Sequence, residues 1–155
     1  ALQALVDASD LEPPEKLVEG EFEHRISHLE ADLKRAGLTL DDYGRQVELT
    51  ELEIRRDFRA EAAKSLKAEL LLEQIARENE IQVTDEDLGR EIAFAAHRAE
   101  RDPKEVAEEL MASGRVSALA ADIMRKKALD YVVEHIDVTG RAVDNPKATV
   151  EANPS

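Results

Sequence analysis

Residues 58–88 read FRAEAAKSLKAELLLEQIARENEIQVTDEDL, and this stretch decides the fold class. As far as Asn79 it has the apolar spacing of a long amphipathic helix. Thr84 and Asp87 then form a capping-box pattern, which predicts that a second helix starts after a short turn. The consecutive leucines in LLLEQIA (70–76) are too apolar for one narrow buried stripe. We therefore expect two apolar faces on the long helix.

The composition of the chain favours an all-α fold. Hydrophobic residues make up 43% of the 155 residues, but aromatic residues make up only 3% and there is no Trp. A core must therefore be built from Leu, Ile, Val and Ala, which suits helices. Charged residues reach 36%, and Glu, Lys and Arg are strong helix formers. The length is sufficient for one domain with its own core.

Start and stop signals outline about six helices, preceded by a short helical segment at 1–6. Pro14 is expected in the first turn of the first long helix, and Gly37 and Gly114 are placed as C-terminal stops. On the helix expected at residues 103–114 the inward face is predicted to carry Val106, Leu110 and Met111. The expected helices cover residues 14–36, 40–47, 51–79, 85–99, 103–114 and 115–133.

The predicted domain organisation is a helical domain over residues 1–138 and a flexible tail over 139–155, where helical periodicity ends. A helix of about 25 residues spans roughly 40 Å, which is too long to be hidden in a compact ball of this size. We therefore expect long helical arms. Because the chain begins with Ala1 and not with Met, we also expect it to be a fragment of a larger multidomain protein.

No pattern indicates catalysis, a cofactor or a metal ion. His24 and His28 are four residues apart, with Glu21 one turn earlier, as zinc ligands can be. However, Arg25 stands where the H-E-x-x-H motif needs its glutamate, and no third strong ligand is identifiable, so a solvated polar face is favoured. The chain has no Cys and no glycine-rich phosphate loop. We expect no catalytic residue, no cofactor and no metal.

The charge of the chain limits its partners. A formal net charge of −14 is repelled by phosphate backbones and by anionic lipid, so neither nucleic acid nor a membrane is an expected partner. No apolar run approaches the ~20 residues of a membrane span, and no signal peptide is visible. These features, with the absence of Cys, are compatible with a cytoplasmic protein.

Exposed apolar surface is the remaining functional candidate. A groove lined by apolar side chains and rimmed by charge can bind many apolar peptide segments without selecting one particular sequence. The alternative is that these residues pack only against each other or against one fixed partner, as in a helical scaffold or a dimerisation module. The candidate contacts, chosen from the apolar seams, are Phe22, Ile26, Leu29, Leu33, Leu52, Ile54, Phe58, Met111, Val116 and Leu119.

Four stretches, taken together and in order, resemble the C-terminal chaperone domain of bacterial trigger factor. PEKLV (14–18) followed by Glu21 is similar to the family's P-x-x-L-V-x-x-E helix start. Residues 61–86 are similar to its signature ending in I-x-V-T-D-E-E. DPKEV (102–106) is similar to D-P-E-E-V, and DIMRKKALDY (122–131) to D-I-L-R-x-K-A-L-D-F-L.

The resemblance implies an all-α fold with two helical arms, related to the peptide-binding domain of periplasmic chaperones such as SurA. It implies ATP-independent binding of unfolded or nascent polypeptides, which assists protein folding and export in the cytoplasm. In the family, ribosome docking and peptidyl-prolyl isomerisation belong to other domains. Their ribosome-docking loop is absent from this sequence, so ribosome contact is expected only through a missing N-terminal domain, and no catalysis is expected here. The run of leucines at 70–72 is assigned to the core and not to the client.

Overall fold

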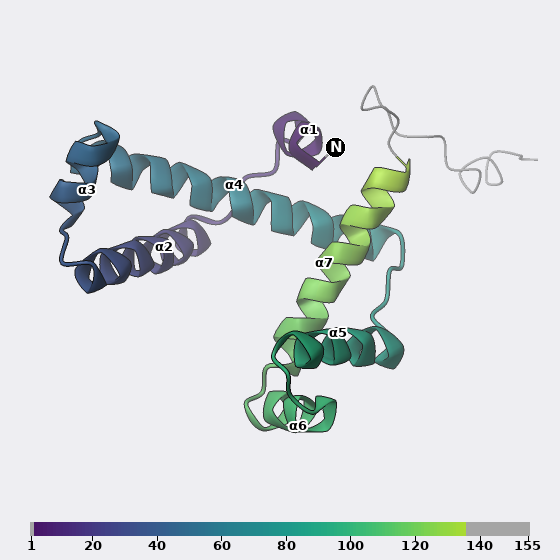
Figure 1. The fold of residues 1–155 in the computed structure, drawn as a ribbon. Helices are drawn as coiled ribbons and strands as arrows, with labels where there is room; N and C mark the ends of the chain where they lie inside the picture. The colour runs from purple at the N-terminus through teal and green to yellow at the C-terminus, as the bar shows by residue number, and fades with distance from the viewer. Residues whose placement is uncertain (1, 136–155) are drawn as a thin grey trace, which may run out of the picture. The chain divides into compact units, whose positions relative to one another are not determined.

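The computed structural model describes residues 2–135, and over this range the chain forms seven α-helices and no strand (Figure 1). The all-α prediction is therefore confirmed. The predicted end of the domain at residue 138 and the predicted tail at 139–155 lie outside the described residues. The helices are α1 (Leu2–Ala8), α2 (Glu15–Arg35), α3 (Leu40–Val47), α4 (Glu51–Glu78), α5 (Asp85–Arg98), α6 (Pro103–Ala112) and α7 (Val116–His135).

The helix starts are set by local hydrogen bonds that the sequence predicts. At the start of α5, the Asp87 amide donates to Thr84 Oγ1 (3.2 Å), and the Thr84 amide donates to the Asp87 carboxylate (3.0 Å). Reciprocal bonds of the same kind begin α3, at Thr39, and α4, at Thr50. Each pair satisfies two amides that the first turn of a helix leaves without partners. Pro14 was expected in the first turn of α2. It is instead the residue that immediately precedes the helix, which begins at Glu15.

The helix ends show one feature that the sequence did not predict. Gly37 and Gly114 have positive φ angles of 73° and 69° and end α2 and α6, as expected. However, Glu48, Glu80 and Glu100 also have positive φ, between 52° and 57°, although their side chains disfavour this conformation. After Glu80, the Ile81 amide donates to the Ala76 carbonyl (2.8 Å). This bond is typical of a helix end that reverses through a left-handed residue.

The described residues divide into two compact units. Within the described range, unit 1 comprises residues 2–5 and 72–135, and unit 2 comprises Val6–Leu71. Helix α4 therefore contributes to both, with its last seven residues in unit 1. Leu71 and Leu72, at the division, are both buried. The leucine run thus supplies core residues to both units, which accounts for the apolar excess noted in the sequence.

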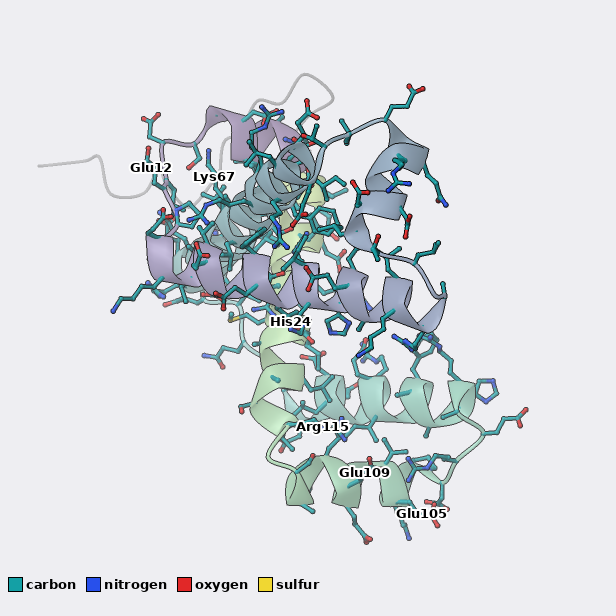
Figure 2. The ribbon with its side chains drawn as sticks, turned by 90° about the vertical axis from the view of Figure 1, so that its left-hand side faces the viewer. Glu12, His24, Lys67, Glu105, Glu109 and Arg115 are labelled. Atoms are coloured by element: carbon teal, nitrogen blue, oxygen red, sulfur yellow. The ribbon has the colours of Figure 1, made fainter. Side chains whose placement is uncertain are left out.

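In unit 2, α2 crosses the first part of α4, and α3 joins the two at one end (Figures 1 and 2). The core of this unit is apolar and includes Val18, Ile26 and Leu33 from α2 and Ile54 and Ala62 from α4. α3 is also part of this packing, through a buried glycine. A Cβ atom added at Gly44 would lie 2.5 Å from the carbonyl oxygen of Leu49 and 3.4 Å from Cδ1 of Ile54.

In unit 1, α5 lies beside α6 and contacts α7 (Figure 1). The core cluster of this unit consists of Leu72, Ala76 and Ala128, with five partly buried residues around it: Leu2, Ile75, Ile81, Met124 and Leu129. The Lys127 ammonium group of α7 donates to the Gln82 carbonyl (2.6 Å) and to the Asp87 carboxylate (2.7 Å). This lysine therefore connects α7 to the turn before α5 and to the first turn of α5.

The inward face predicted for α6 is partly wrong. Val106 and Leu110 are half-buried, but Met111 is 71% exposed. Adjacent residues on a helix point about 100° apart, so Leu110 and Met111 cannot both face the same narrow seam. Helix α6 lies against α5, and of the two residues Leu110 is the one that is half-buried.

Candidate functional site

An open depression in unit 2, with a volume of about 470 Å³, lies where α2 passes α4. Two residues predicted to contact a client, Leu29 of α2 and Phe58 of α4, both line it. They are 29 positions apart in the sequence, and the crossing of the helices brings them together. The other lining residues are polar: His24, Arg25, His28 and Asp32. Figure 2 shows His24 on α2.

Arginines hold α2 against α4 around this depression. The Arg25 guanidinium donates to the Ser65 hydroxyl of α4 (2.7 Å) and to the Glu21 carboxylate (2.7 Å). From α4, Arg55 reaches Glu30 of α2 (3.0 Å). These groups are at least partly exposed, so each pair contributes little stability. Of these groups, Arg25 lines the depression itself and places a charge beside its apolar side chains.

Arg59 of α4 forms the densest of these contacts. It pairs with both Glu15 and Glu19 of α2. Its guanidinium carbon also lies 5.9 Å from the centre of the Phe22 ring, within the range of a cation–π contact. Hydrogen bonds to the two carboxylates raise the pKa of the Arg59 guanidinium. Phe22, another predicted contact residue, therefore has one ring face covered by a charged group that is itself held in place.

The ten predicted contact residues fall into three classes of exposure. Ile26, Leu33 and Ile54 are buried in unit 2 and belong to its core. Leu52 and Met111 are exposed, at 79% and 71%. The remaining five are half-buried: Phe22, Leu29, Phe58, Val116 and Leu119. Of the ten, Met111, Val116 and Leu119 belong to unit 1, and the depression brings together only Leu29 and Phe58.

Among residues 2–135, five other large apolar side chains are exposed and were not among the predicted contacts: Leu17, Val47, Leu49, Phe94 and Val133. Phe94 is the clearest case, at 58% exposed. It lies off the apolar stripe of α5, on which Leu88 and Ile92 are half-buried and Ala96 is buried. An aromatic residue off the buried stripe of an amphipathic helix is a signal that could have identified it from the sequence.

Over residues 2–135 there is no group of three or more His, Cys, Asp or Glu side chains placed to hold a metal ion. Within the same range, none of the helices has the length and apolar character needed to cross a membrane. The side chains that are buried are all apolar in the described part of the chain. The depression of unit 2 thus combines two apolar side chains with two imidazoles and two charged groups.

Comparison with known proteins decides the family. The family model described as "Bacterial trigger factor protein (TF) C-terminus" matches residues 1–134. The chain belongs to the trigger factor family. The resemblance found in the sequence motifs is thereby confirmed, and it extends over almost all of the described helices.

Individual trigger factors agree with this assignment. The trigger factor of Salinispora arenicola is 32% identical over 142 residues, which is 92% of this chain and 32% of that protein. The trigger factor of Moorella thermoacetica is 35% identical over 134 residues, 86% of this chain and 29% of that protein. The chain thus spans about a third of the length of these relatives.

A solved structure of trigger factor domains from Thermotoga maritima shows the same fold. Its TM-score is 0.68 at 22% identity, over 88% of this chain and 78% of that chain. At this identity the likeness concerns the fold alone.

Proposed function

We propose that this chain is an ATP-independent chaperone domain, which binds unfolded or nascent polypeptides in the cytoplasm and assists their folding and export. Membership of the trigger factor family supports a chaperone role. The observation that supports the binding mode is the open depression of unit 2, whose lining includes Leu29 and Phe58 together with charged side chains.

The proposed contact surface is smaller than the set predicted from the sequence. Ile26, Leu33 and Ile54 are buried, so a client could reach them only if unit 2 opened, and we leave them out. In unit 2 the surface consists of Phe22, Leu29, Leu52 and Phe58; in unit 1 it consists of Met111, Val116 and Leu119.

Binding to this surface should be broad and weak. Apolar contacts have no directional requirement, so many client sequences can be accommodated. A flexible client also loses conformational entropy when it is held, which opposes binding. Dissociation constants on the order of micromolar are therefore expected.

The test is suppression of aggregation. The chain is added in stoichiometric amounts to a chemically unfolded client protein, and light scattering is followed after dilution without nucleotide. The proposal predicts reduced scattering by the unchanged chain and weaker suppression by the double variant Leu52→Ser, Met111→Ser. Both side chains are largely exposed, so the substitutions should change the free energy of unfolding by less than about 0.5 kcal/mol each.

The matched control is the double variant Gln46→Ser, Glu108→Ser, which changes exposed polar residues on α3 and α6. It should suppress aggregation as well as the unchanged chain does. Failure of the unchanged chain to suppress aggregation would overturn the chaperone proposal. Saturable binding of one protein, with no binding of several unrelated apolar peptides, would instead favour the scaffold alternative.

A further inference from the structure

His24 and His28 form a pair of imidazoles on one face of α2. They are four residues apart, which places them one above the other on a helix. The centres of their rings are 4.6 Å apart and the ring planes meet at 68°. Both side chains are exposed and both line the depression of unit 2. The rings are therefore close together and open to solvent.

We propose that His24 and His28 together bind one first-row transition-metal ion, with copper(II) bound most tightly. A metal–nitrogen bond is about 2.0–2.1 Å, and an imidazole centre lies roughly 1.1 Å behind its nitrogen. Two imidazoles at about 90° around one ion therefore have ring centres about 4.5 Å apart. The observed separation, an edge-to-face contact with ring centres 4.6 Å apart, is compatible with this value. An angle near 90° is the tetragonal arrangement that copper(II) and nickel(II) prefer.

The charged groups around the pair allow a cation to approach. Arg25 also lines the depression, but its guanidinium is held by the Glu21 carboxylate and the Ser65 hydroxyl. Asp32 contributes a carboxylate to the same depression, paired with Arg35. One cationic and one anionic side chain thus line the depression beside the imidazoles.

The predicted site has two protein ligands, and water fills the remaining positions. The residues described by the structure contain no cluster of three metal-binding side chains, so this site should exchange its ion freely. It is therefore not a structural metal centre of the kind that holds a fold together. Imidazole suits copper, nickel and zinc, whereas magnesium and calcium prefer oxygen ligands. Affinity should follow copper(II) above nickel(II) and zinc(II), with no binding of magnesium at the pair.

The test is a titration of the full chain with copper(II), read by calorimetry and by electron paramagnetic resonance. One ion per chain should bind with coupling to two imidazole nitrogens. Removing one ligand abolishes the advantage of chelation, so His24→Gln and His28→Gln should each weaken binding at least about tenfold. His97→Gln is the matched control, since His97 is also exposed and lies on α5. It should leave the affinity unchanged.

Equal weakening by all three variants, no weakening by His24→Gln and His28→Gln, or a spectrum with oxygen ligands alone would each overturn the assignment. Because metal ions and protons compete for the imidazoles, lower pH should also weaken binding by the unchanged chain. This proposal does not rest on the chaperone function, and its outcome leaves that function untouched.

Discussion

Replacing Gly44 by Ala tests whether the packing of α3 in unit 2 is as close as the structure indicates. Gly44 is a buried helical residue, and an added Cβ would lie 2.5 Å from the carbonyl oxygen of Leu49, closer than the 3.0 Å that real Cβ atoms keep. That oxygen is part of the backbone. It cannot rotate away as the end of a side chain would, so the chain after α3 must move. The amide of the same residue, Leu49, donates to the Gly44 carbonyl (2.9 Å), and the movement strains this bond.

Two opposing effects set the magnitude. Ala in place of Gly inside a helix stabilises by roughly 0.5–1 kcal/mol. Forcing an additional methyl group into a closely packed site costs about 1–3 kcal/mol. Gly20 in α2 and Gly89 in α5 have no atom within 4 Å of an added Cβ, so only the first effect applies to them. Gly44→Ala should therefore be less stable than Gly20→Ala by about 1–3 kcal/mol.

Urea unfolding followed by far-ultraviolet circular dichroism measures these differences, with Gly20→Ala and Gly89→Ala as matched controls. Hydrogen exchange then locates the effect, because the amides of α3 and of Leu49 should exchange faster in Gly44→Ala. The reasoning is refuted if Gly44→Ala is as stable as Gly20→Ala and its α3 amides keep their protection.

Two further predictions concern the helix ends and the acid range. Glu80→Gly and Glu100→Gly should each raise the free energy of unfolding by about 0.5–1 kcal/mol, because glycine has no Cβ to disfavour the positive φ angle at these positions. Thermal unfolding measures this change. An unchanged or lower midpoint temperature would contradict the prediction. The Lys127 ammonium group and an N-cap amide lower the pKa of Asp87 from its usual 3.8 to about 2. The stabilising effect of ionised Asp87 should be complete above about pH 4 and lost as the pH falls towards 2. Lys127→Met should flatten this part of the plot of unfolding free energy against pH. If the variant and the unchanged chain give identical plots, the ion pair has no such effect.

Much of the secondary structure could be predicted because its determinants lie within a few residues of each other. The capping bonds at Thr84 join residues three apart, and the stops at Gly37 and Gly114 depend on a single backbone conformation. The glutamates at positive φ could not be predicted in this way. At Glu80 the hydrogen bonds of the helix end override the local preference of the side chain.

The candidate site was predictable in part. Apolar spacing identified Leu29 and Phe58, but spacing alone could not separate Leu52, 79% exposed, from Ile54, 2% exposed. These two residues are two positions apart on α4 and point in different directions, and only the position of the neighbouring helices decides which of them is covered.

The sequence by itself determined that this protein is helical, where its helices start and to which family it belongs. The capping hydrogen bonds, the helical period of the apolar residues and the family motifs all depend on residues that are close together in the sequence. Only the tertiary structure decided which apolar residues form the cores and which line an open surface, and it alone brought Phe58 of α4 to the same depression as Leu29 of α2. The physical reason is that burial depends on contacts between α2 and α4, whose contacting residues are tens of positions apart in the sequence.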